Sequence, residues 1–187
     1  MRVISGTARG RRLLAPHDRR VRPTSDRIKE ALFSIIVSLR GDLLGSSVLD
    51  LCSGTGSLGI EALSRGAAEA VFVDNHRDSA LLIKKNLAET GLASKAEVLI
   101  VDARAAVSRL AGQGRRFHLV FADPPYGQGI AADLLNQVSA HEILCDGALV
   151  VVETAAGEQL SETVGTLQQF DLRKYGDTAL TFFTRTL

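Results

Sequence analysis

The residues 121–129, FADPPYGQG, bring together side chains that could handle a planar amine. An apolar run ends here in Asp123, Pro124, Pro125 and Tyr126. Two successive prolines stiffen the backbone and donate no hydrogen bond, so the carbonyls of Asp123 and Pro124 remain available as acceptors. If the Asp123 carboxylate and the Pro124 carbonyl each accept one amine hydrogen, the nitrogen lone pair can point at an electrophile. Tyr126 then offers a face on which a nucleobase can stack.

A less specific interpretation of this stretch is a stiff loop with a capping Asp and a core Tyr. The pattern favours the chemical interpretation, because an exocyclic amine is a poor nucleophile and needs this kind of orientation. We therefore take Asp123, Pro124, Pro125 and Tyr126 as the candidate catalytic residues.

A second candidate segment is the glycine-rich stretch DLCSGTGSLG at residues 50–59. It follows an apolar strand-like run and precedes a helix, where open α/β sheets bind ligands. Gly54 and Gly56 would let the backbone approach a ligand closely. Residues 54–59 also match GxGxxG, and Asp74 closes the next strand-like run, so a nicotinamide dinucleotide is one possible ligand.

Asp50 favours a different ligand. A carboxylate four residues before the first glycine is unfavourable beside a pyrophosphate but suits a cation. S-adenosylmethionine carries a sulfonium and an ammonium group, Asp74 could accept from its ribose hydroxyls, and Asp102 could accept from its adenine amine. Alternatively, each of these acids only caps the helix that follows it. The full set of candidate cofactor contacts is Asp50, Cys52, Ser53, Gly54, Gly56, Asp74, Asn75, Asp102, Ala103 and Thr24.

The elements that would position these residues alternate along the chain. Short apolar strands are expected at 47–52, 70–75, 97–103, 118–123 and 148–154, with helices near 57–65, 77–90, 104–110 and 131–140 between them. This alternation predicts a doubly wound α/β fold with a parallel sheet covered on both faces. Two strand-like runs joined by a Gly-Asp turn predict an antiparallel hairpin at the C-terminal end.

The N-terminal part is strongly basic. Residues 1–29 hold nine basic and two acidic side chains, a net charge of +7, whereas the remaining 13 basic and 19 acidic side chains give −6. The runs 2–5 and 11–15 flank a glycine-bounded turn, so we expect residues 1–22 to form a basic β-hairpin extension of one domain, 1–187. The charge indicates an anionic polymer as partner. The candidate nucleic-acid contacts are Arg9, Arg11, Arg12, Arg22 and Arg27.

A helix is expected to follow this extension. Its apolar residues recur at helical spacing, Thr24 or Ser25 is the candidate N-cap, and Gly41 lies past its end. The expected buried face consists of Ile28, Ala31, Leu32, Ile35 and Leu39. Arg22, Thr24 and Arg27 could face the cofactor or RNA phosphate, or could simply begin the packed helix.

The composition limits the other classes of protein. At 45% hydrophobic and 23% charged residues, with no apolar run near the roughly 18 residues of a membrane span, the sequence predicts a soluble cytoplasmic protein. The start shows no secretory signal. The two cysteines, Cys52 and Cys145, have no metal-ligand spacing, so neither zinc nor a disulfide is expected. We take a monomer as the default.

The segments DLCSGTGSLGIEALSRGA and FADPPYG resemble the class I S-adenosylmethionine-dependent methyltransferases that modify exocyclic amines. With RPTSDRIKEALFSII at 22–36, the chain resembles the bacterial 16S rRNA guanine-N2 methyltransferase family, RsmD type, over almost its whole length. The resemblance implies a Rossmann-like, seven-stranded, mostly parallel sheet with an antiparallel last strand. It also implies one guanine of 16S rRNA as target, in the small ribosomal subunit or an assembly intermediate.

In that family the acidic residue after the second strand is often Glu and the fourth motif often ends in Phe, whereas this chain has Asp74 and Tyr126. The shorter Asp weakens the expected ribose contact, while Tyr keeps the stacking face. Glu153 is a further pocket candidate. No general base is evident in the sequence, so the amine proton could leave to Asp123 or to water.

Other activities remain open from the sequence. An adenine-N6 or protein-glutamine methyltransferase would use the same motif, although 187 residues leave little room for a DNA target-recognition domain. A nicotinamide-dependent oxidoreductase would have no use for Asp50 or the DPPY motif. A nonenzymatic RNA-binding protein would not need the acceptors at 123 and 124.

Overall fold

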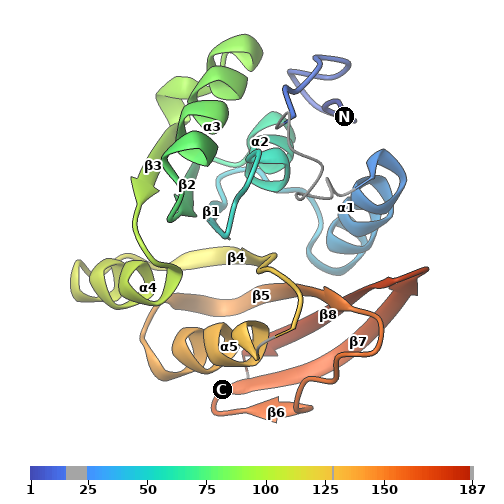
Figure 1. Ribbon diagram of the computed structural model, residues 1–187, viewed down its shortest axis with the longest axis vertical. Helices are drawn as coiled ribbons and strands as arrows, with labels where there is room; N and C mark the ends of the chain where they lie inside the picture. The colour runs from blue at the N-terminus through green and yellow to red at the C-terminus, as the bar shows by residue number, and fades with distance from the viewer. Residues whose placement is uncertain (16–24, 128, 186–187) are drawn as a thin grey trace.

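The computed structural model, which describes residues 1–15, 25–127 and 129–185, is organised around one mostly parallel sheet (Figure 1). The strand order is β3-β2-β1-β4-β5-β8-β7-β6. The strands are β1 (Ser47–Leu51), β2 (Glu69–Asp74), β3 (Ala96–Ile100), β4 (Phe117–Ala122), β5 (Leu144–Ala155), β6 (Thr163–Val164), β7 (Leu167–Tyr175) and β8 (Thr178–Arg185). The helices are α1 (Asp26–Arg40), α2 (Ser57–Ser64), α3 (Arg77–Thr90), α4 (Ala103–Gly112) and α5 (Ile130–Ala140), with a short 3₁₀ helix at Ala93–Lys95.

The Rossmann-like α/β fold expected from the sequence is confirmed. Strands β1 to β5 are parallel, and the order reverses between β1 and β4, where doubly wound sheets bind ligands. The C-terminal hairpin of β7 and β8 is present, and β8 inserts between β5 and β7, antiparallel to both. The strand count differs from the expected seven, because the two-residue β6 adds an eighth strand beside β7. So short a strand leaves little periodicity to detect in the sequence.

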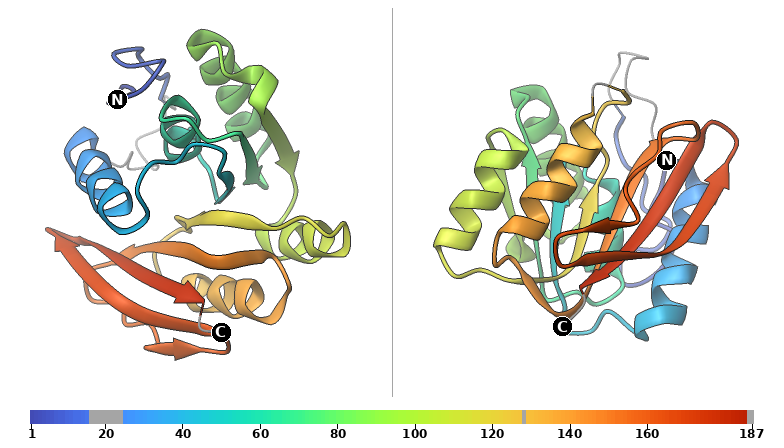
Figure 2. Two further views of the ribbon diagram at one scale, coloured as in Figure 1. Left: turned by 180° about the vertical axis from the view of Figure 1, so that it is seen from behind. Right: turned by 90° about the horizontal axis from the view of Figure 1, so that it is seen from below.

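The helices cover both faces of the sheet. Apolar side chains from α1, α2 and α3 pack in one core cluster, and those from α4 and α5 pack in a second cluster on the opposite face. In the right-hand view of Figure 2, α1 lies on one side of the strands and α4 and α5 on the other. Because consecutive side chains of a strand point to opposite faces, β1, β4 and β5 contribute to both clusters.

Helix α1 begins and ends as the sequence indicated, but it buries a different face. The Ser25 side chain accepts a hydrogen bond from the Ile28 backbone N–H, and Gly41 follows the helix with a positive φ of 81°. The expected face was wrong in part: Leu39 is half-exposed, whereas Lys29 is fully buried. The remaining buried residues of α1 are Leu32, Phe33 and Ile36.

The described N-terminal residues 1–15 form an arm that turns back on itself. An isolated antiparallel bridge joins Arg2 and Arg12, and the Val3 backbone N–H donates to the Arg11 carbonyl over 2.9 Å. The arm therefore has the pairing of a hairpin, but within the described residues it contains no extended strand. The expected hairpin was to continue to residue 22, and its part from 16 onward lies outside the described residues.

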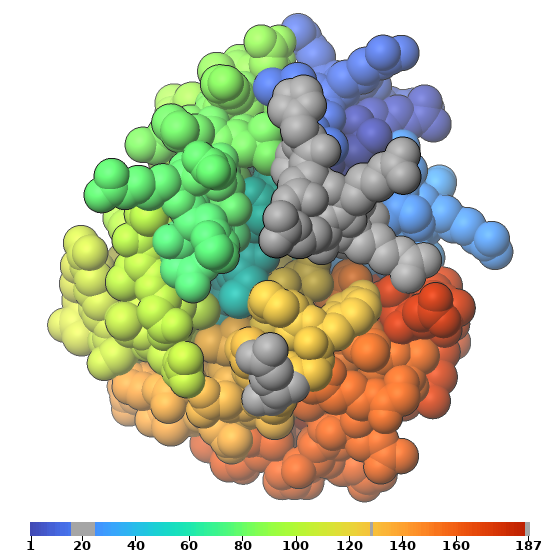
Figure 3. Space-filling view, in the orientation of Figure 1, coloured from blue at the N-terminus to red at the C-terminus, as the bar shows by residue number. Residues whose placement is uncertain are grey.

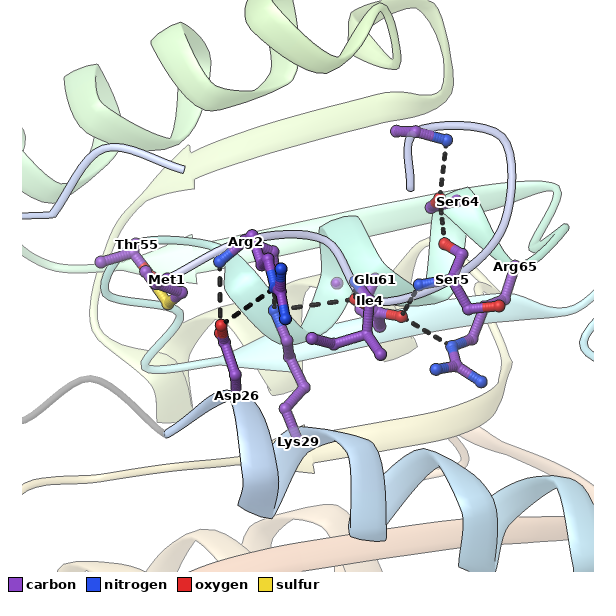
Figure 4. A network of polar contacts seen from close by, with 12 residues as sticks. Met1, Arg2, Ile4, Ser5, Asp26, Lys29, Thr55, Glu61, Ser64 and Arg65 are labelled. Carbon is purple, nitrogen blue, oxygen red and sulfur yellow. Dashed lines mark hydrogen bonds and ion pairs between the residues drawn. The ribbon is translucent and has the colours of Figure 1, made fainter. Parts of the chain in front are cut away.

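Glu61 on α2 anchors this arm (Figure 4). Its carboxylate accepts hydrogen bonds from the backbone N–H groups of Ile4 (2.8 Å) and Ser5 (3.0 Å) and from Arg65 Nε (2.7 Å). Lys29 Nζ lies 3.6 Å from the same carboxylate and donates to the Arg2 carbonyl over 2.6 Å. One buried acid thus connects the arm to α1 and α2.

Candidate active site

A cleft of about 600 Å³ lies at the carboxyl ends of β1, β2, β4 and β5. In Figure 3 the teal atoms of the loop after β1 are recessed between the green atoms after β2 and the yellow atoms after β4. Most of the residues predicted as functional line this cleft: Asp50, Cys52, Ser53, Gly54, Asp74, Asn75, Asp102, Ala103, Asp123, Pro124, Pro125 and Tyr126. Glu153, the weaker candidate, lines it as well.

The glycines of the loop after β1 have different tasks. Gly54 lines the cleft with φ of +56°, and a Cβ there would meet nothing within 4 Å, so its backbone faces open space. Gly56 does not line the cleft, contrary to the expectation that it contacts a ligand; it is the left-handed N-cap of α2. A Cβ at Gly59 would lie 2.4 Å from a ring atom of Phe72, so this glycine permits close packing of α2 on β2.

Cys52 lies where β1 enters this loop and has a positive φ of 59°. Within the described residues no other non-glycine residue has a positive φ, and such strain is concentrated at functional sites. Burial, followed by the charges of Asp74 and Asp123, raises the pKa of the Cys52 thiol to about 12. The residue therefore remains a neutral thiol that shapes the turn.

Asp50 is a buried carboxyl group at the floor of the cleft. Its Oδ2 accepts a hydrogen bond from the Gly59 backbone N–H over 2.9 Å, so the proposed capping role is real. Burial nevertheless raises its pKa to about 8, with a further increase from the charge of Asp74. A ligand cation would therefore be stabilised at this position, because it would supply the opposite charge that a buried carboxylate requires.

Asp74 and Asp102 combine structural hydrogen bonds with exposure to the cleft. The two carboxylate oxygens of Asp74 accept from the backbone N–H groups of Gly54 and His76, each over 2.9 Å. Each oxygen keeps a further lone pair for a ligand hydroxyl. Asp102 is the N-cap of α4 and accepts from the Arg104 backbone N–H over 2.9 Å, and the hydrogen bonds with Arg104 lower its pKa.

Asp123 comes directly after β4, and Glu153 lies on the neighbouring parallel strand β5. The last paired residues before them are Ala122 on β4 and Val152 on β5, which places both acids at the same end of the sheet. Burial raises the pKa of Asp123 well above its usual range, and the negative charges of Glu153 and Asp50 raise it further. The carboxyl groups thus disfavour one another's charge, which makes this end of the cleft receptive to hydrogen-bond donors.

Tyr126 stands at the rim of the cleft and is 40% exposed. Its hydroxyl group donates to Glu153 Oε1 over 2.9 Å and lies 3.1 Å from Thr178 Oγ1. The ring is therefore accessible to a ligand at the rim, whereas the hydroxyl group is hydrogen-bonded to residues of β5 and β8.

The four candidate nucleic-acid residues that the structure describes lie outside this cleft. Arg9, Arg11 and Arg12 are exposed on the arm, and Arg11 reaches the Glu89 carbonyl of α3 over 3.4 Å. Arg27 is exposed in the first turn of α1. The fifth nucleic-acid candidate, Arg22, lies outside the described residues, as does the cofactor candidate Thr24.

Several residues around the cleft carried no signal in the sequence. His76 and Ser79 line it from the start of α3, Arg104 from α4, and Ile130 and Leu134 from α5.

Asn86 is fully buried on α3; its amide donates to the Thr55 carbonyl (2.9 Å) and the Leu14 carbonyl (3.1 Å), and accepts from the Leu14 N–H (2.7 Å). It joins the glycine loop to the arm. A buried amide on a helix has no distinctive spacing that could reveal this.

Two kinds of feature are absent from the described part of the chain. No group of His, Cys, Asp and Glu side chains there is arranged to hold a metal ion. No helix in residues 25–127 or 129–185 has the length and apolar character that a bilayer span requires.

Comparison with known proteins agrees with this architecture. The family model described as "Conserved hypothetical protein 95" matches residues 1–184. Ribosomal RNA small subunit methyltransferase D of Escherichia coli K12 is 37% identical over 82% of this chain and 74% of its own length. The enzyme of the same name from Haemophilus influenzae is 32% identical over 86% and 81%.

Solved structures show the same fold. A hypothetical protein of Thermus thermophilus superimposes with a TM-score of 0.83 at 30% identity, covering 97% of this chain and 98% of that one. The crystal structure of SMU.776 complexed with SAH is more distant, with a TM-score of 0.70 and 15% identity over 88% of this chain and 50% of that one. The sheet topology and the cleft at the carboxyl ends of its strands are those of a Rossmann-like methyltransferase. Within that class, the chain belongs to the family of conserved hypothetical protein 95, the RsmD-type methyltransferases.

Proposed function

We propose that this protein transfers the methyl group of S-adenosylmethionine to the exocyclic N2 amine of a guanine in 16S rRNA. The observation that carries the proposal is the cleft itself, in which Asp123, Pro124 and Tyr126 face the same space as Asp50, Gly54 and Asp74. One end of the cleft thus suits an amine and a stacked base, and the other suits a cationic ligand. The relatives named for ribosomal RNA small subunit methylation support the choice of substrate.

The residues present fit the cofactor. Asp50 is a buried acid with a raised pKa, and a sulfonium or ammonium group would supply the missing positive charge. Open space in front of Gly54 leaves room for a ligand beside its backbone, and Asp74 can accept ribose hydroxyls. Asp102 and Ala103 line the same cleft and would hold the adenine. The cofactor supplies an electrophilic methyl group.

The chain's own residues orient the nucleophile. The Asp123 carboxylate and the Pro124 carbonyl accept the two amine hydrogens, which directs the nitrogen lone pair at the methyl carbon. In the proposed transfer the amine nitrogen would take the methyl group, and the electron pair of the broken C–S bond would stay on the sulfur of the cofactor. The methylated nitrogen then releases one proton, for which Asp123 and water are the available acceptors. Tyr126 stacks on the guanine ring throughout.

The basic arm would bind phosphates around the target. Arg9, Arg11 and Arg12 are exposed there, and contacts of this kind position RNA without reading its sequence. A guanine in a loop can be rotated into the cleft at small cost. We expect the substrate to be the small subunit or an assembly intermediate, and the enzyme to act as a cytoplasmic monomer.

The test is transfer of labelled methyl groups from S-adenosylmethionine to small ribosomal subunits that lack the modification, with naked 16S rRNA alongside. Nucleoside analysis should find the label in N2-methylguanosine. Label in N6-methyladenosine would show that the target base is adenine rather than guanine. Label in protein would show that the substrate is a protein rather than RNA. Absence of transfer to any of these, with bound S-adenosylhomocysteine, would refute the proposed activity while leaving the cofactor assignment in place.

A further inference from the structure

We propose that Thr178 and Glu153 are positioning residues for the target base, because they hold the Tyr126 ring at the rim of the cleft. This inference rests on the proposed function, in which the base stacks on Tyr126. It assigns a role in the active site to the C-terminal hairpin, which contributes Thr178 as the first residue of β8.

The three side chains come from separate parts of the fold. Tyr126 lies in the loop after β4, Glu153 on β5 and Thr178 on β8. In the antiparallel pair of β5 and β8, Thr178 lies opposite Ala155 and Glu153 lies opposite Leu180, so the two holding residues are diagonal neighbours. Diagonal neighbours are close enough to contact the same group.

The hydrogen bonds have a consistent direction. A carboxylate only accepts, so the Tyr126 hydroxyl donates its proton to Glu153 Oε1 over 2.9 Å. The phenolic oxygen can then accept from the Thr178 hydroxyl, 3.1 Å away. Burial and the neighbouring negative charges raise the pKa of Tyr126 to about 12, so the phenol keeps its proton at neutral pH.

The difference in burial explains why such a support matters. Thr178 and Glu153 are 5% and 7% exposed, whereas Tyr126 is 40% exposed and belongs to no helix or strand. An exposed aromatic side chain on a loop would otherwise exchange between rotamers, and ordering it would cost free energy each time a base binds. With its hydroxyl fixed to two buried residues of the sheet, the ring is oriented before the base arrives.

The test is a double-mutant cycle of Thr178→Val and Tyr126→Phe, with Thr178→Ser as the control that keeps the hydroxyl. In the wild-type background, Thr178→Val should lower kcat/KM for the small subunit by about 3- to 10-fold. In the Tyr126→Phe background the same change should have less than about a 2-fold effect, because no phenol remains to be held. Affinity for S-adenosylhomocysteine should stay within about 2-fold in every variant, and Thr178→Ser should restore most of the activity.

A second measurement does not depend on turnover. The chain has two tyrosines, Tyr126 and Tyr175, so 3-fluorotyrosine labelling gives two ¹⁹F signals that Tyr126→Phe assigns. Thr178→Val should shift or broaden the Tyr126 signal, and Thr178→Ser should not. An unchanged signal, or equal effects of Thr178→Val in both backgrounds, overturns the inference. Failure of the wild-type enzyme to methylate guanine overturns the proposed function instead, and the ¹⁹F spectra still decide whether the ring is held.

Discussion

Lys29 and Glu61 form an ion pair in which both side chains are fully buried and Nζ lies 3.6 Å from Oε2. Burial lowers the pKa of Lys29, and the charge of Glu61 opposes that change. Three backbone groups of the arm contact this buried pair, and Val3, Ala8 and Leu13 of the arm pack in the core, so the arm is an integral part of the fold.

We therefore expect Glu61→Ala to destabilise the protein strongly. It leaves Lys29 as an uncompensated buried charge and two arm N–H groups without their acceptor, which should cost about 3–5 kcal/mol of unfolding free energy. Urea denaturation measures this value, and limited proteolysis should show faster cleavage within the arm. The matched control is Glu142→Ala, which breaks the exposed pair with Arg116 and should cost under about 1 kcal/mol. Equal costs for the two variants would contradict the anchoring role.

Replacing Asp123 should impair methyl transfer without impairing cofactor binding. Asp123→Asn keeps the shape of the side chain but changes the acceptor that aligns the amine, so we expect methyl transfer to fall by at least about 100-fold. Calorimetric titration with S-adenosylhomocysteine should give an affinity close to that of the wild type. If the cofactor affinity falls together with the activity, Asp123 supports the cleft rather than the nucleophile.

Ligand-dependent thermal stabilisation should show which cofactor binds and whether Asp74 holds it. A ligand that binds only the folded state raises the apparent melting temperature, so S-adenosylhomocysteine should stabilise the wild-type protein and NAD should not. Asp74→Ala removes the acceptor for the Gly54 and His76 N–H groups and for the ribose, and should abolish this ligand-dependent shift. Stabilisation by NAD at the same concentration would count against the methyltransferase assignment of the cleft.

Asp50 should make the stability of the free protein depend on pH. Its pKa is about 8 in the folded state, against an ordinary value of 3.8. Between these values the folded protein retains a proton that the unfolded chain has lost, so this contribution to stability is present below pH 4 and is lost as pH rises to 8. The variant Asp50→Asn keeps a side-chain oxygen that can accept from the Gly59 N–H, but it has no carboxyl proton to lose.

The unfolding free energy of Asp50→Asn should therefore match that of the wild type near pH 4 and exceed it by roughly 5 kcal/mol at pH 8, because a pKa difference of one unit corresponds to about 1.4 kcal/mol. Chemical denaturation at several pH values gives the difference between the two proteins. Curves that run parallel across this range would show that the Asp50 carboxyl is ionised in the free protein.

The arginines of the arm should affect RNA binding and its salt dependence together. Arg9→Ala with Arg12→Ala should raise KM for the small subunit and reduce the slope of log affinity against log salt by about 0.7–0.9 for each phosphate that the arm no longer neutralises. Affinity for S-adenosylhomocysteine should not change, because neither residue lines the cleft. Arg109→Ala, on α4 and across the sheet, is the matched control and should leave both quantities unchanged.

The sequence predicted the parts of the site that lie at strand ends. Asp50, Asp74 and Asp123 each follow or interrupt an apolar run, and parallel strands bring such ends to one edge, so their meeting could be foreseen. Thr178 and Asn86 could not, because their roles depend on where a hairpin turn and a helix face come to lie.

Two further features could not be predicted from the sequence, for similar reasons. In the sequence, Lys29 is recognisable only as one of the basic residues of the N-terminal part, because its burial depends on the position of Glu61. Gly56 matched a ligand-binding motif, but the backbone uses it to begin α2. Local patterns therefore predicted the sheet and its acids, whereas contacts between distant segments decided the rest.

The buried amide of Asn86 has a thermodynamic consequence. It binds the Thr55 carbonyl of the glycine loop and both backbone groups of Leu14 in the arm, so neither segment can shift without disturbing the same side chain. Any change in the loop on cofactor binding would then alter the affinity of the arm for RNA. Reciprocity requires RNA to alter cofactor affinity by the same factor, so the two binding equilibria would be coupled through the side chain of Asn86.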